Sequence, residues 1–393
     1  MGTLAAVMTG KGIGAISVIQ LFGDTAQIIL SRIFKPTGSK PARFETGEIL
    51  LGTIVNGTET IDQVVIGCEG TGNYTINCHG NPLIVADIMQ LLEKTGATPV
   101  AAEKLLAEIL SVQKQINTIA LEAKLTCPRA RTLEGTKIIA NQVEAGLSKA
   151  AQSWLENIKS GPLDQIKSQA EQILRQSQTA KLIIAGCTIT LAGPANTGKS
   201  TLLNCLAGRQ KAIVTDIKGT TRDWVSAQCR IGPLAAELID TAGLDESVAE
   251  SDAVDRASQQ RSLDILGNVD LVLLVLDNSQ PANEQLPKLL LEKITNKRIL
   301  TVLNKSDLPA EFDVNSLPTV LAETVQISAK FETGIENFKE KILNILSIAG
   351  FDAKQAVCFT ARQKDLLKRL EKTGSKDDAV SVITELLNGQ LKV

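Results

Sequence analysis

The chain has 393 residues, 44% of them hydrophobic, and its 41 Lys and Arg against 43 Asp and Glu give a net charge of −2. This length predicts about two to four domains with buried cores. The near-zero charge excludes a global basic field for holding nucleic acid or an anionic membrane. The single histidine, His79, excludes zinc sites built on two or three histidines.

Seven cysteines lie far apart without Cys-x-x-Cys spacing, a pattern typical of reduced cytosolic thiols and not of redox or zinc motifs. The amino-terminal segment has no signal-peptide pattern, and no run of about 18 apolar residues occurs. We therefore expect a cytoplasmic protein without a membrane partner.

Residues 1–98 alternate strand-like and helix-like segments, which predicts a small α/β domain. Asn81 and Pro82 mark the start of a helix that runs through Leu92 to a cap at Gly96. Apolar, β-branched runs predict the strands of this domain at 15–21, 48–55, 64–67 and 74–77.

A helical domain is predicted in two parts, 99–180 and 351–393, because both carry apolar residues at helical spacing among charged ones. Between them, residues 181–350 alternate apolar strands with helices, which predicts a parallel sheet covered on both faces. The predicted strands of this inserted domain lie at 187–192, 235–239, 271–276, 299–303 and 325–327.

The segment Gly193–Ser200 matches the phosphate-binding loop pattern G-x-x-x-x-G-K-S, and it follows a strand and opens a helix. Its glycines let backbone N–H groups turn toward phosphates, Lys199 reaches the β- and γ-oxygens, and Ser200 ligates Mg²⁺. Asp240 begins Asp-Thr-Ala-Gly at the end of a later strand, where a carboxylate can hold Mg²⁺ through water.

Asn304-Lys-Ser-Asp307 also follows a strand, and a carboxylate there accepts hydrogen bonds from guanine N1–H and its exocyclic amine, which adenine does not offer. Ser328-Ala-Lys330 is placed to contact the base again. The predicted GTP-binding residues are Asn196, Thr197, Gly198, Lys199, Ser200, Thr201, Thr215, Asp216, Ile217, Lys218, Gly219, Thr220, Thr221, Asp240, Thr241, Ala242, Gly243, Asn304, Lys305, Asp307, Ser328, Ala329 and Lys330.

The loop 215–223 contains threonines, and one of them can complete the Mg²⁺ shell when the γ-phosphate is present. Leu244 follows Gly243, where Ras-type proteins carry a glutamine that orients water. Either another group positions the attacking water, or hydrolysis is slow. No arginine finger is identifiable, so a monovalent cation is the natural source of positive charge, and Asn196 offers it an amide oxygen.

Three segments, Gly193–Ser200, Ala212–Asp223 and Asp240–Leu244, together resemble the family of the tRNA-modification GTPase MnmE (TrmE). The order of domains supports this resemblance, as do the glycine-rich opening Thr9–Gly23 and the turn His79–Pro82. The resemblance implies a homodimer with potassium-stimulated GTP hydrolysis when two G domains meet.

Carried over position by position, the resemblance implies a K⁺ site at Asn196, Thr215, Ile217 and Thr220. It implies Mg²⁺ ligands at Ser200 and Thr221. The groups that act in hydrolysis would be Lys199, Thr221 and an acidic residue that acts on water, matched best by Asp255 with Glu250 as the other possibility.

The resemblance further implies an FAD-containing partner, tRNA as substrate and a formyl-tetrahydrofolate in the amino-terminal domain. The sequence departs from the family pattern at Gln20, where an Arg is usual, and around Gly72–Tyr74. It ends in Gly389–Val393 without the family's Cys-Ile-Gly-Lys tail, so we expect a divergent member. These departures leave two alternatives open, a regulatory GTPase that has lost the tRNA-modification role and a ribosome-assembly GTPase.

Overall fold

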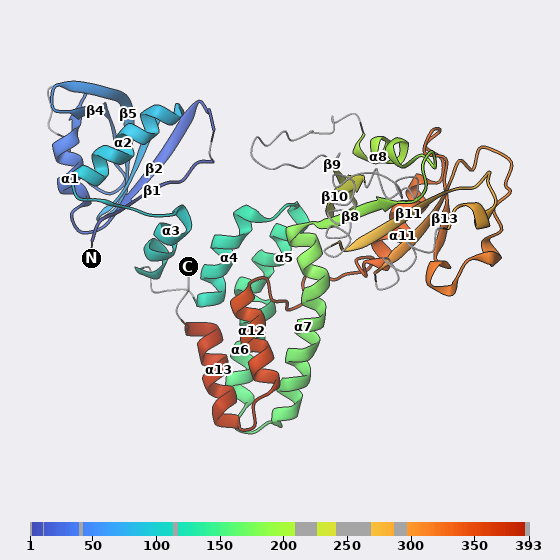
Figure 1. Cartoon of the computed structure of the whole chain (residues 1–393). Coiled ribbons are helices and arrows are strands. Elements are labelled where there is room, and N and C mark those ends of the chain that lie inside the picture. Colours follow the sequence, from blue (N-terminus) through green and yellow to red (C-terminus); the bar gives the residue numbers. More distant parts are fainter. Residues whose placement is uncertain are drawn as a thin grey trace, which may run out of the picture. The chain divides into compact units, whose positions relative to one another are not determined.

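The computed structural model describes residues 2–10, 12–38, 42–112, 117–208, 226–240, 269–286 and 297–389. The chain divides into two compact units, with residues 1–125 and 389–393 in unit 1 and residues 126–388 in unit 2 (Figure 1). Within the described ranges, no helix combines the length and the apolar character needed to cross a membrane.

Unit 1 contains a seven-stranded sheet with the strand order β3-β4-β5-β6-β2-β1-β7. Its strand pairs are antiparallel, except that β1 and β7 run parallel. The elements of this unit are β1 (Leu4–Val7), β2 (Ile16–Phe22), α1 (Ala26–Ile33), β3 (Phe34–Pro36), β4 (Ile49–Asn56), β5 (Glu59–Gly70), β6 (Asn73–His79), α2 (Pro82–Lys94), β7 (Thr98–Pro99), α3 (Ala102–Val112) and α4 (Thr118–Thr126).

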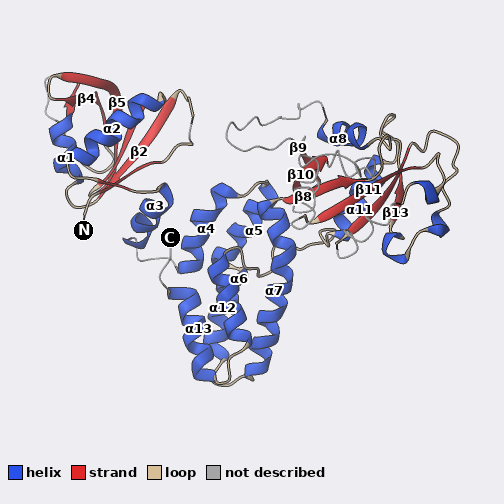
Figure 2. Cartoon of the chain, viewed as in Figure 1, coloured by secondary structure: helices blue, strands red, loops and turns tan. Residues whose placement is uncertain are grey.

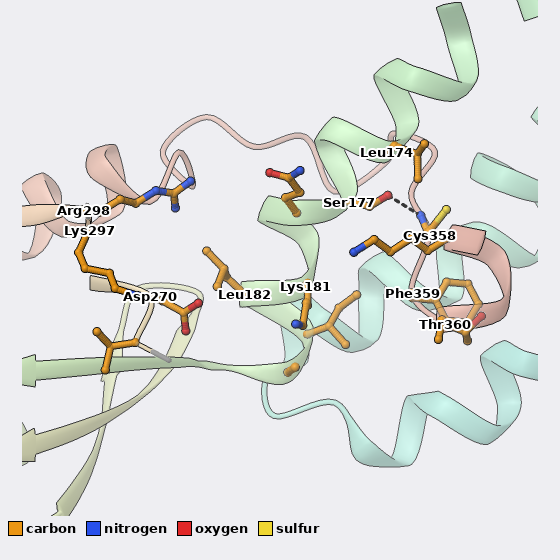
Figure 3. Close-up of a pocket in the computed structure, with 16 residues that line it drawn as sticks. Leu174, Ser177, Lys181, Leu182, Asp270, Lys297, Arg298, Cys358, Phe359 and Thr360 are labelled. Atoms are coloured by element: carbon orange, nitrogen blue, oxygen red, sulfur yellow. Dashed lines mark hydrogen bonds between the residues drawn. The ribbon is translucent and has the colours of Figure 1, made fainter. Parts of the chain in front are cut away.

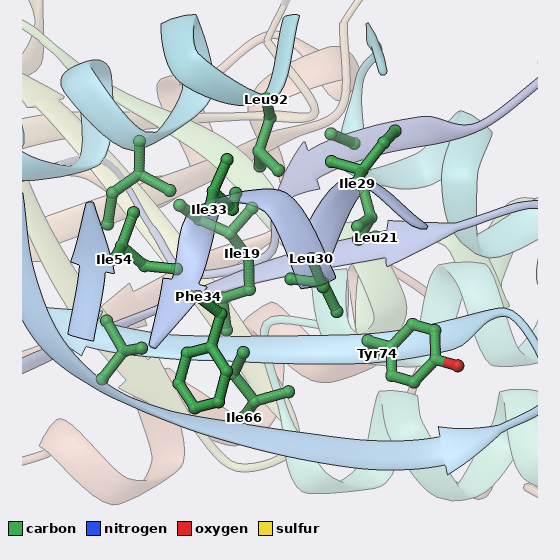
Figure 4. Close-up of a cluster of buried hydrophobic side chains, with 14 of the residues drawn as sticks. Ile19, Leu21, Ile29, Leu30, Ile33, Phe34, Ile54, Ile66, Tyr74 and Leu92 are labelled. Carbon is green, nitrogen blue, oxygen red and sulfur yellow. The ribbon is translucent and has the colours of Figure 1, made fainter. Parts of the chain in front are cut away.

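The core of unit 1 lies between one face of this sheet and helices α1 and α2 (Figure 4). Ile19 and Ile66 from the sheet, Leu30 from α1 and Leu92 from α2 are fully buried there. Asn81 caps α2, because its side-chain oxygen accepts a hydrogen bond from the backbone N–H of Leu83 at 2.9 Å. The α/β character predicted for residues 1–98 is confirmed.

The helical part of unit 2 consists of segments that are far apart in the sequence. Helix α12 packs on α7 and α13, and α5 packs on α6 and α7 (Figure 2). The helices are α5 (Leu133–Glu144), α6 (Gly146–Asn157), α7 (Leu163–Ala185), α12 (Ala361–Glu371) and α13 (Lys376–Asn388), with a short 3₁₀ turn at Cys127–Arg129.

Gln142 joins the two sequence segments of this helical part. Its fully buried side chain accepts hydrogen bonds from the backbone N–H groups of Leu147, at 2.8 Å, and Val357, at 3.0 Å. Its amide nitrogen donates to the carbonyl oxygens of Ile138 and Gln355 at 2.9 and 3.1 Å. One side chain on α5 thus satisfies the backbone of the segment that returns from the inserted domain.

The inserted domain, hereafter the G domain, has a six-stranded sheet in the order β13-β12-β11-β8-β10-β9. The central strands β8, β11 and β12 are mainly apolar and almost entirely buried, as expected for a sheet that is covered on both faces. The elements are β8 (Cys187–Ala192), α8 (Lys199–Ala207), β9 (Ser226–Ile231), β10 (Leu234–Asp240), β11 (Leu271–Asp277), β12 (Ile299–Asn304), β13 (Thr324–Gln326) and α11 (Ile335–Ile345), with 3₁₀ turns at Ala282–Glu284, Val314–Ser316 and Thr319–Leu321.

The expected fold class is confirmed, with two differences in detail. The G-domain sheet is not wholly parallel, because β9 pairs antiparallel with β10 in a hairpin that turns at Gly232. Helix α7 continues past the expected boundary at 180 to Ala185, because Leu182, Ile183 and Ile184 are buried against neighbouring elements and the first helix break is Gly186.

Candidate nucleotide-binding site

The phosphate-binding loop joins β8 to α8 through Gly193–Gly198. Gly193 has a φ of 138°, and a Cβ there would collide with the carbonyl oxygen of Val275 on β11. Gly198 has a φ of 91°, and its Cβ would collide with the side-chain nitrogen of Asn304. The two glycines are therefore required by backbone conformation and by space, as the sequence pattern predicted.

Lys199 is the first residue of α8, and its side chain folds back over the loop. Its ammonium donates to the carbonyl oxygens of Gly193 and Pro194 at 2.8 and 2.7 Å. The amino-terminal end of α8 and this ammonium thus lie together at the loop. Partial positive charge at a helix start and a lysine beside it favour a bound phosphate.

Ser200 and Asp240 come together as the sequence predicted. The Ser200 hydroxyl donates to Asp240 Oδ2 at 3.0 Å. Asp240 is 5% exposed, and its other carboxylate oxygen, Oδ1, is buried without a hydrogen-bond partner in the part of the chain that the structure describes. A buried carboxylate oxygen left unpaired is costly, and a cation at this position would satisfy it.

Asn304, at the end of β12, holds two loops of the site together. Its Nδ2 donates to the carbonyl oxygen of Thr197 in the phosphate-binding loop at 2.9 Å. Its Oδ1 accepts from the backbone N–H of Ala329 at 3.0 Å. The side chain is 3% exposed, so both of its polar groups are used inside the protein.

Asp307 and Ser328 lie side by side, as expected for a guanine pocket. The Ser328 hydroxyl donates to Asp307 Oδ1 at 2.6 Å, and the backbone N–H of Ser306 donates to the carbonyl oxygen of Ile327 at 3.0 Å. Asp307 itself is exposed, so its carboxylate is accessible to a base. The neighbouring Lys330 places its ammonium 5.2 Å from the centre of the Phe331 ring.

Asp277, at the end of β11, is a site residue that the sequence analysis missed. Its carboxylate forms an ion pair with Lys305 at 2.5 Å and accepts from the Ser279 hydroxyl at 2.6 Å. Burial acts to raise the pKa of Asp277, but the hydrogen bonds from Lys305 and Ser279 outweigh it and hold the pKa below its ordinary value. The sequence feature that could have indicated Asp277 is its place as an acidic residue at the end of an apolar strand.

The side chain of Gln285 fixes the backbone of Asp277 through hydrogen bonds. Its Oε1 accepts from the backbone N–H of Asp277 at 2.6 Å, and its Nε2 donates to the carbonyl oxygens of Asp277 and Gln280 at 2.8 and 3.0 Å. Gln285 is 4% exposed. The turn after β11 is therefore fixed by a buried side chain, which in turn fixes the carboxylate that orients Lys305.

Several predicted site residues lie outside the described residues. These are the switch-loop residues, the residues after Asp240 and the acidic candidates: Thr215, Asp216, Ile217, Lys218, Gly219, Thr220, Thr221, Thr241, Ala242, Gly243, Glu250 and Asp255. Of the four residues expected to hold K⁺, only Asn196 is described. It is exposed in the phosphate-binding loop and has a φ of 62°. The structure brings the phosphate-binding loop, Asp240 and the base loops to one edge of the sheet.

Two family models agree with this arrangement. A family model described as 50S ribosome-binding GTPase matches residues 188–305, and one described as GTP-binding protein TrmE N-terminus matches residues 3–104. Among solved structures, the G domain of the T. maritima FeoB iron transporter is 28% identical and covers 40% of this chain and 98% of that chain, with a TM-score of 0.33.

Curated proteins match across both units. The tRNA modification GTPase MnmE of Lactiplantibacillus plantarum is 30% identical over 390 residues, which cover 90% of this chain and 83% of that protein. MnmE of Enterococcus faecalis is 30% identical over 380 residues, and the match covers 87% of this chain and 81% of that protein. Together with the GTPase model on the domain that carries this geometry, these matches make the protein a GTP-binding and GTP-hydrolysing enzyme. The resemblance noted in the sequence is confirmed, and the chain belongs to the family of the tRNA modification GTPase MnmE.

Proposed function

We propose that this protein is a cation-dependent GTPase that acts in the modification of tRNA wobble uridines together with an FAD-containing partner enzyme. One observation supports this most directly. The match to MnmE extends over 90% of the chain and includes the amino-terminal unit as well as the G domain. A likeness confined to the G domain would fit any GTPase of this class.

Mg²⁺ is the metal that the nucleotide site fits. Ser200 Oγ and the unpaired Asp240 Oδ1 are hard oxygen donors, and they lie beside the phosphate-binding loop. Ser200 and, from the resemblance, Thr221 would hold the ion, and Asp240 would hold it through water. When bound, Mg²⁺ neutralises charge that develops on the β- and γ-phosphate oxygens.

The chain's own residues would contribute to hydrolysis by positioning the phosphates and the attacking water and by placing positive charge beside the phosphates. Lys199, already bound to two loop carbonyls, can exchange these contacts for phosphate oxygens with little movement of its backbone. K⁺ would bind at Asn196, Thr215, Ile217 and Thr220 and supply the charge that an arginine finger supplies elsewhere. Asp255 would act on the attacking water, with Glu250 as the alternative. These K⁺ and water assignments come from the family resemblance.

The proposal includes a homodimer, which an apolar surface of unit 1 supports. The sheet face opposite α1 and α2 carries Ile16, Ile49, Leu51 and Val65, which are 64%, 74%, 49% and 36% exposed. Leu51 and Val65 are direct cross-strand partners on β4 and β5. Ile49, Leu51 and Val65 are contiguous on β4 and β5, whereas β6 separates Ile16 on β2 from them. Contiguous exposed apolar side chains such as these three mark interaction surfaces. Binding of a formyl-tetrahydrofolate by this unit stays a prediction of the resemblance.

The test is mass spectrometry of tRNA nucleosides from cells with and without this gene. Loss of a modified wobble uridine, restored by the wild-type gene but not by an Asp240→Asn variant, would support the proposal. Unchanged wobble uridines would refute the tRNA role and would favour a regulatory or ribosome-assembly GTPase. The ribosome-assembly alternative would in that case show as an altered ratio of ribosomal subunits in a sucrose gradient.

A further inference from the structure

A cavity of about 730 Å³ lies in unit 2, at the edge of the G-domain sheet that faces helix α7 (Figure 3). Val269 and Asp270 directly precede β11, and Lys297 and Arg298 directly precede β12. The residues of the nucleotide site follow the opposite, carboxyl ends of the same strands. The cavity is therefore separate from the nucleotide site.

The other walls come from the helical part of the unit. Residues of α7 and of the segment that leads into α12 line the cavity, and Figure 3 shows Lys181 and Leu182 of α7 between Arg298 on one side and Phe359 on the other. The Ser177 hydroxyl of α7 accepts a hydrogen bond from the backbone N–H of Cys358 at 2.7 Å. This bond fixes the returning segment against α7 and gives the cavity a defined wall.

Most of the charged groups of the lining are cationic. It includes four cationic side chains and one carboxylate, namely Lys181, Lys297, Arg298, Lys364 and Asp270. The Asp270 carboxylate already accepts a hydrogen bond from the backbone N–H of Thr188 at 2.8 Å. The first turn of α12 also lines the cavity at Ala361, so the positive end of that helix adds to the potential. This environment favours a bound anion.

The remaining surface of the cavity is largely apolar. Leu182, Ile184 and Val269 are buried side chains of the lining, and Leu174 and Phe359 are half-buried. A volume of this size, with apolar walls and a few charged groups, is typical of sites for small organic molecules. Inorganic phosphate alone would leave the apolar walls without a partner.

We propose that this cavity binds a small organic phosphate, with the phosphate against Lys181, Lys364 and Arg298 and an aromatic or apolar body against the leucines, Val269 and Phe359. A phosphate monoester carries close to two negative charges and three acceptor oxygens at neutral pH, which match several cationic donors better than a single carboxylate does. Because residues of the G domain and of α7 line the same cavity, the ligand contacts both parts of unit 2 at once.

The test uses the full chain with its nucleotide site saturated by GDP and Mg²⁺, and the fluorescent probe 1-naphthyl phosphate. We expect one saturable site per chain, with 1-naphthol and inorganic phosphate each binding at least about tenfold more weakly because each lacks half of the contacts. The Lys181→Gln/Arg298→Gln variant should bind the probe at least about tenfold more weakly, since both side chains are exposed cations of the lining.

The matched control is Lys149→Gln/Lys372→Gln, which removes two exposed lysines outside the cavity and should change the probe's dissociation constant less than about twofold. Thermal unfolding in the presence of GDP shows that each variant is folded. The proposal is overturned if binding of the probe does not saturate below about 1 mM. It is also overturned if the two double variants raise the probe's dissociation constant equally.

Discussion

Asn304 Nδ2 lies 2.9 Å from the carbonyl oxygen of Thr197 and donates a hydrogen bond to it, so the last residue of β12 supports the loop that follows β8. The same amide accepts from Ala329 N–H at 3.0 Å. Two loops that are separate in sequence are thereby held by one buried side chain at the end of β12. The phosphate and base halves of the nucleotide site are coupled through it.

Replacement of this amide should weaken nucleotide binding through the loops that it holds. Asn304→Ala leaves the carbonyl of Thr197 and the N–H of Ala329 without their partner, and we expect GDP affinity to fall by about 10- to 100-fold. Fluorescent-GDP titration measures this. Asn315→Ala, at an exposed turn of the same domain, is the control and should bind GDP like wild type. Equal affinity of both variants would contradict the supporting role of Asn304.

We expect Asp307 to determine the choice of base. Its Oδ1 is oriented by the Ser328 hydroxyl at 2.6 Å, and the carboxylate should accept from guanine N1–H and its exocyclic amine. In Asp307→Asn the amide nitrogen becomes a donor facing the donors of guanine, so we expect GTP affinity to fall about 100-fold or more.

The affinity of Asp307→Asn for xanthosine triphosphate gives a second test, because it should change in the opposite direction. Xanthine presents a carbonyl oxygen where guanine has its amine, so its affinity for Asp307→Asn should rise as that for GTP falls. Competition of both nucleotides against fluorescent GDP gives the two affinities. If GTP binds the variant as well as it binds wild type, Asp307 does not contact the base.

The sequence predicted those parts of the site in which the residues lie within one loop. Gly193–Ser200 and Asn304–Asp307 each follow an apolar strand, and parallel strands bring such loops to one edge. Asp240 ends another parallel strand of this sheet, so the same logic places it near Ser200. The Asp277–Lys305 pair was missed, because it depends on β11 and β12 being adjacent, with Asp277 opposite Asn304 in register, and no local pattern states which strands are neighbours.

Secondary structure was predicted best where strands are buried on both faces. β8 has the predicted bounds, 187–192, whereas β9 was missed. In Ser226–Ile231 the polar Gln228 and Arg230 alternate with Ala227 and Cys229 at the sheet edge, so the segment lacks the continuous apolar run of a central strand. The ion pair of Arg230 with Glu134 on α5, at 2.8 Å, depends on tertiary packing and has no signal in the sequence.

Asn196 tests the monovalent-cation proposal. If its side-chain oxygen ligates K⁺, wild-type GTP hydrolysis should be at least about tenfold faster in potassium than in sodium chloride, and Asn196→Ala should reduce this ratio to about one. Phosphate release under single-turnover conditions measures both rates. Asn204→Ala, an exposed position on α8, should keep the wild-type ratio. A potassium preference that persists in Asn196→Ala would remove Asn196 from the cation site.

The Asp277–Lys305 ion pair should make the stability of the G domain depend on pH. The pKa of Asp277 is lowered from 3.8 in the folded protein, so the pair stabilises the fold above the unfolded pKa and is lost as the pH falls through the folded one. Asp277→Asn should therefore lower the free energy of unfolding by about 1–2 kcal/mol at pH 7 and by progressively less below pH about 4.

Urea unfolding followed by circular dichroism at pH 7 and at pH about 3 measures this difference. Glu336→Gln is the matched control, since it removes a surface ion pair with Lys339 in which the Glu336 side chain is 84% exposed. Such pairs contribute at most a few tenths of a kcal/mol, so this variant should unfold like wild type at both pH values. A destabilisation by Asp277→Asn that is the same at both pH values would mean that the carboxylate acts through packing and not through its charge.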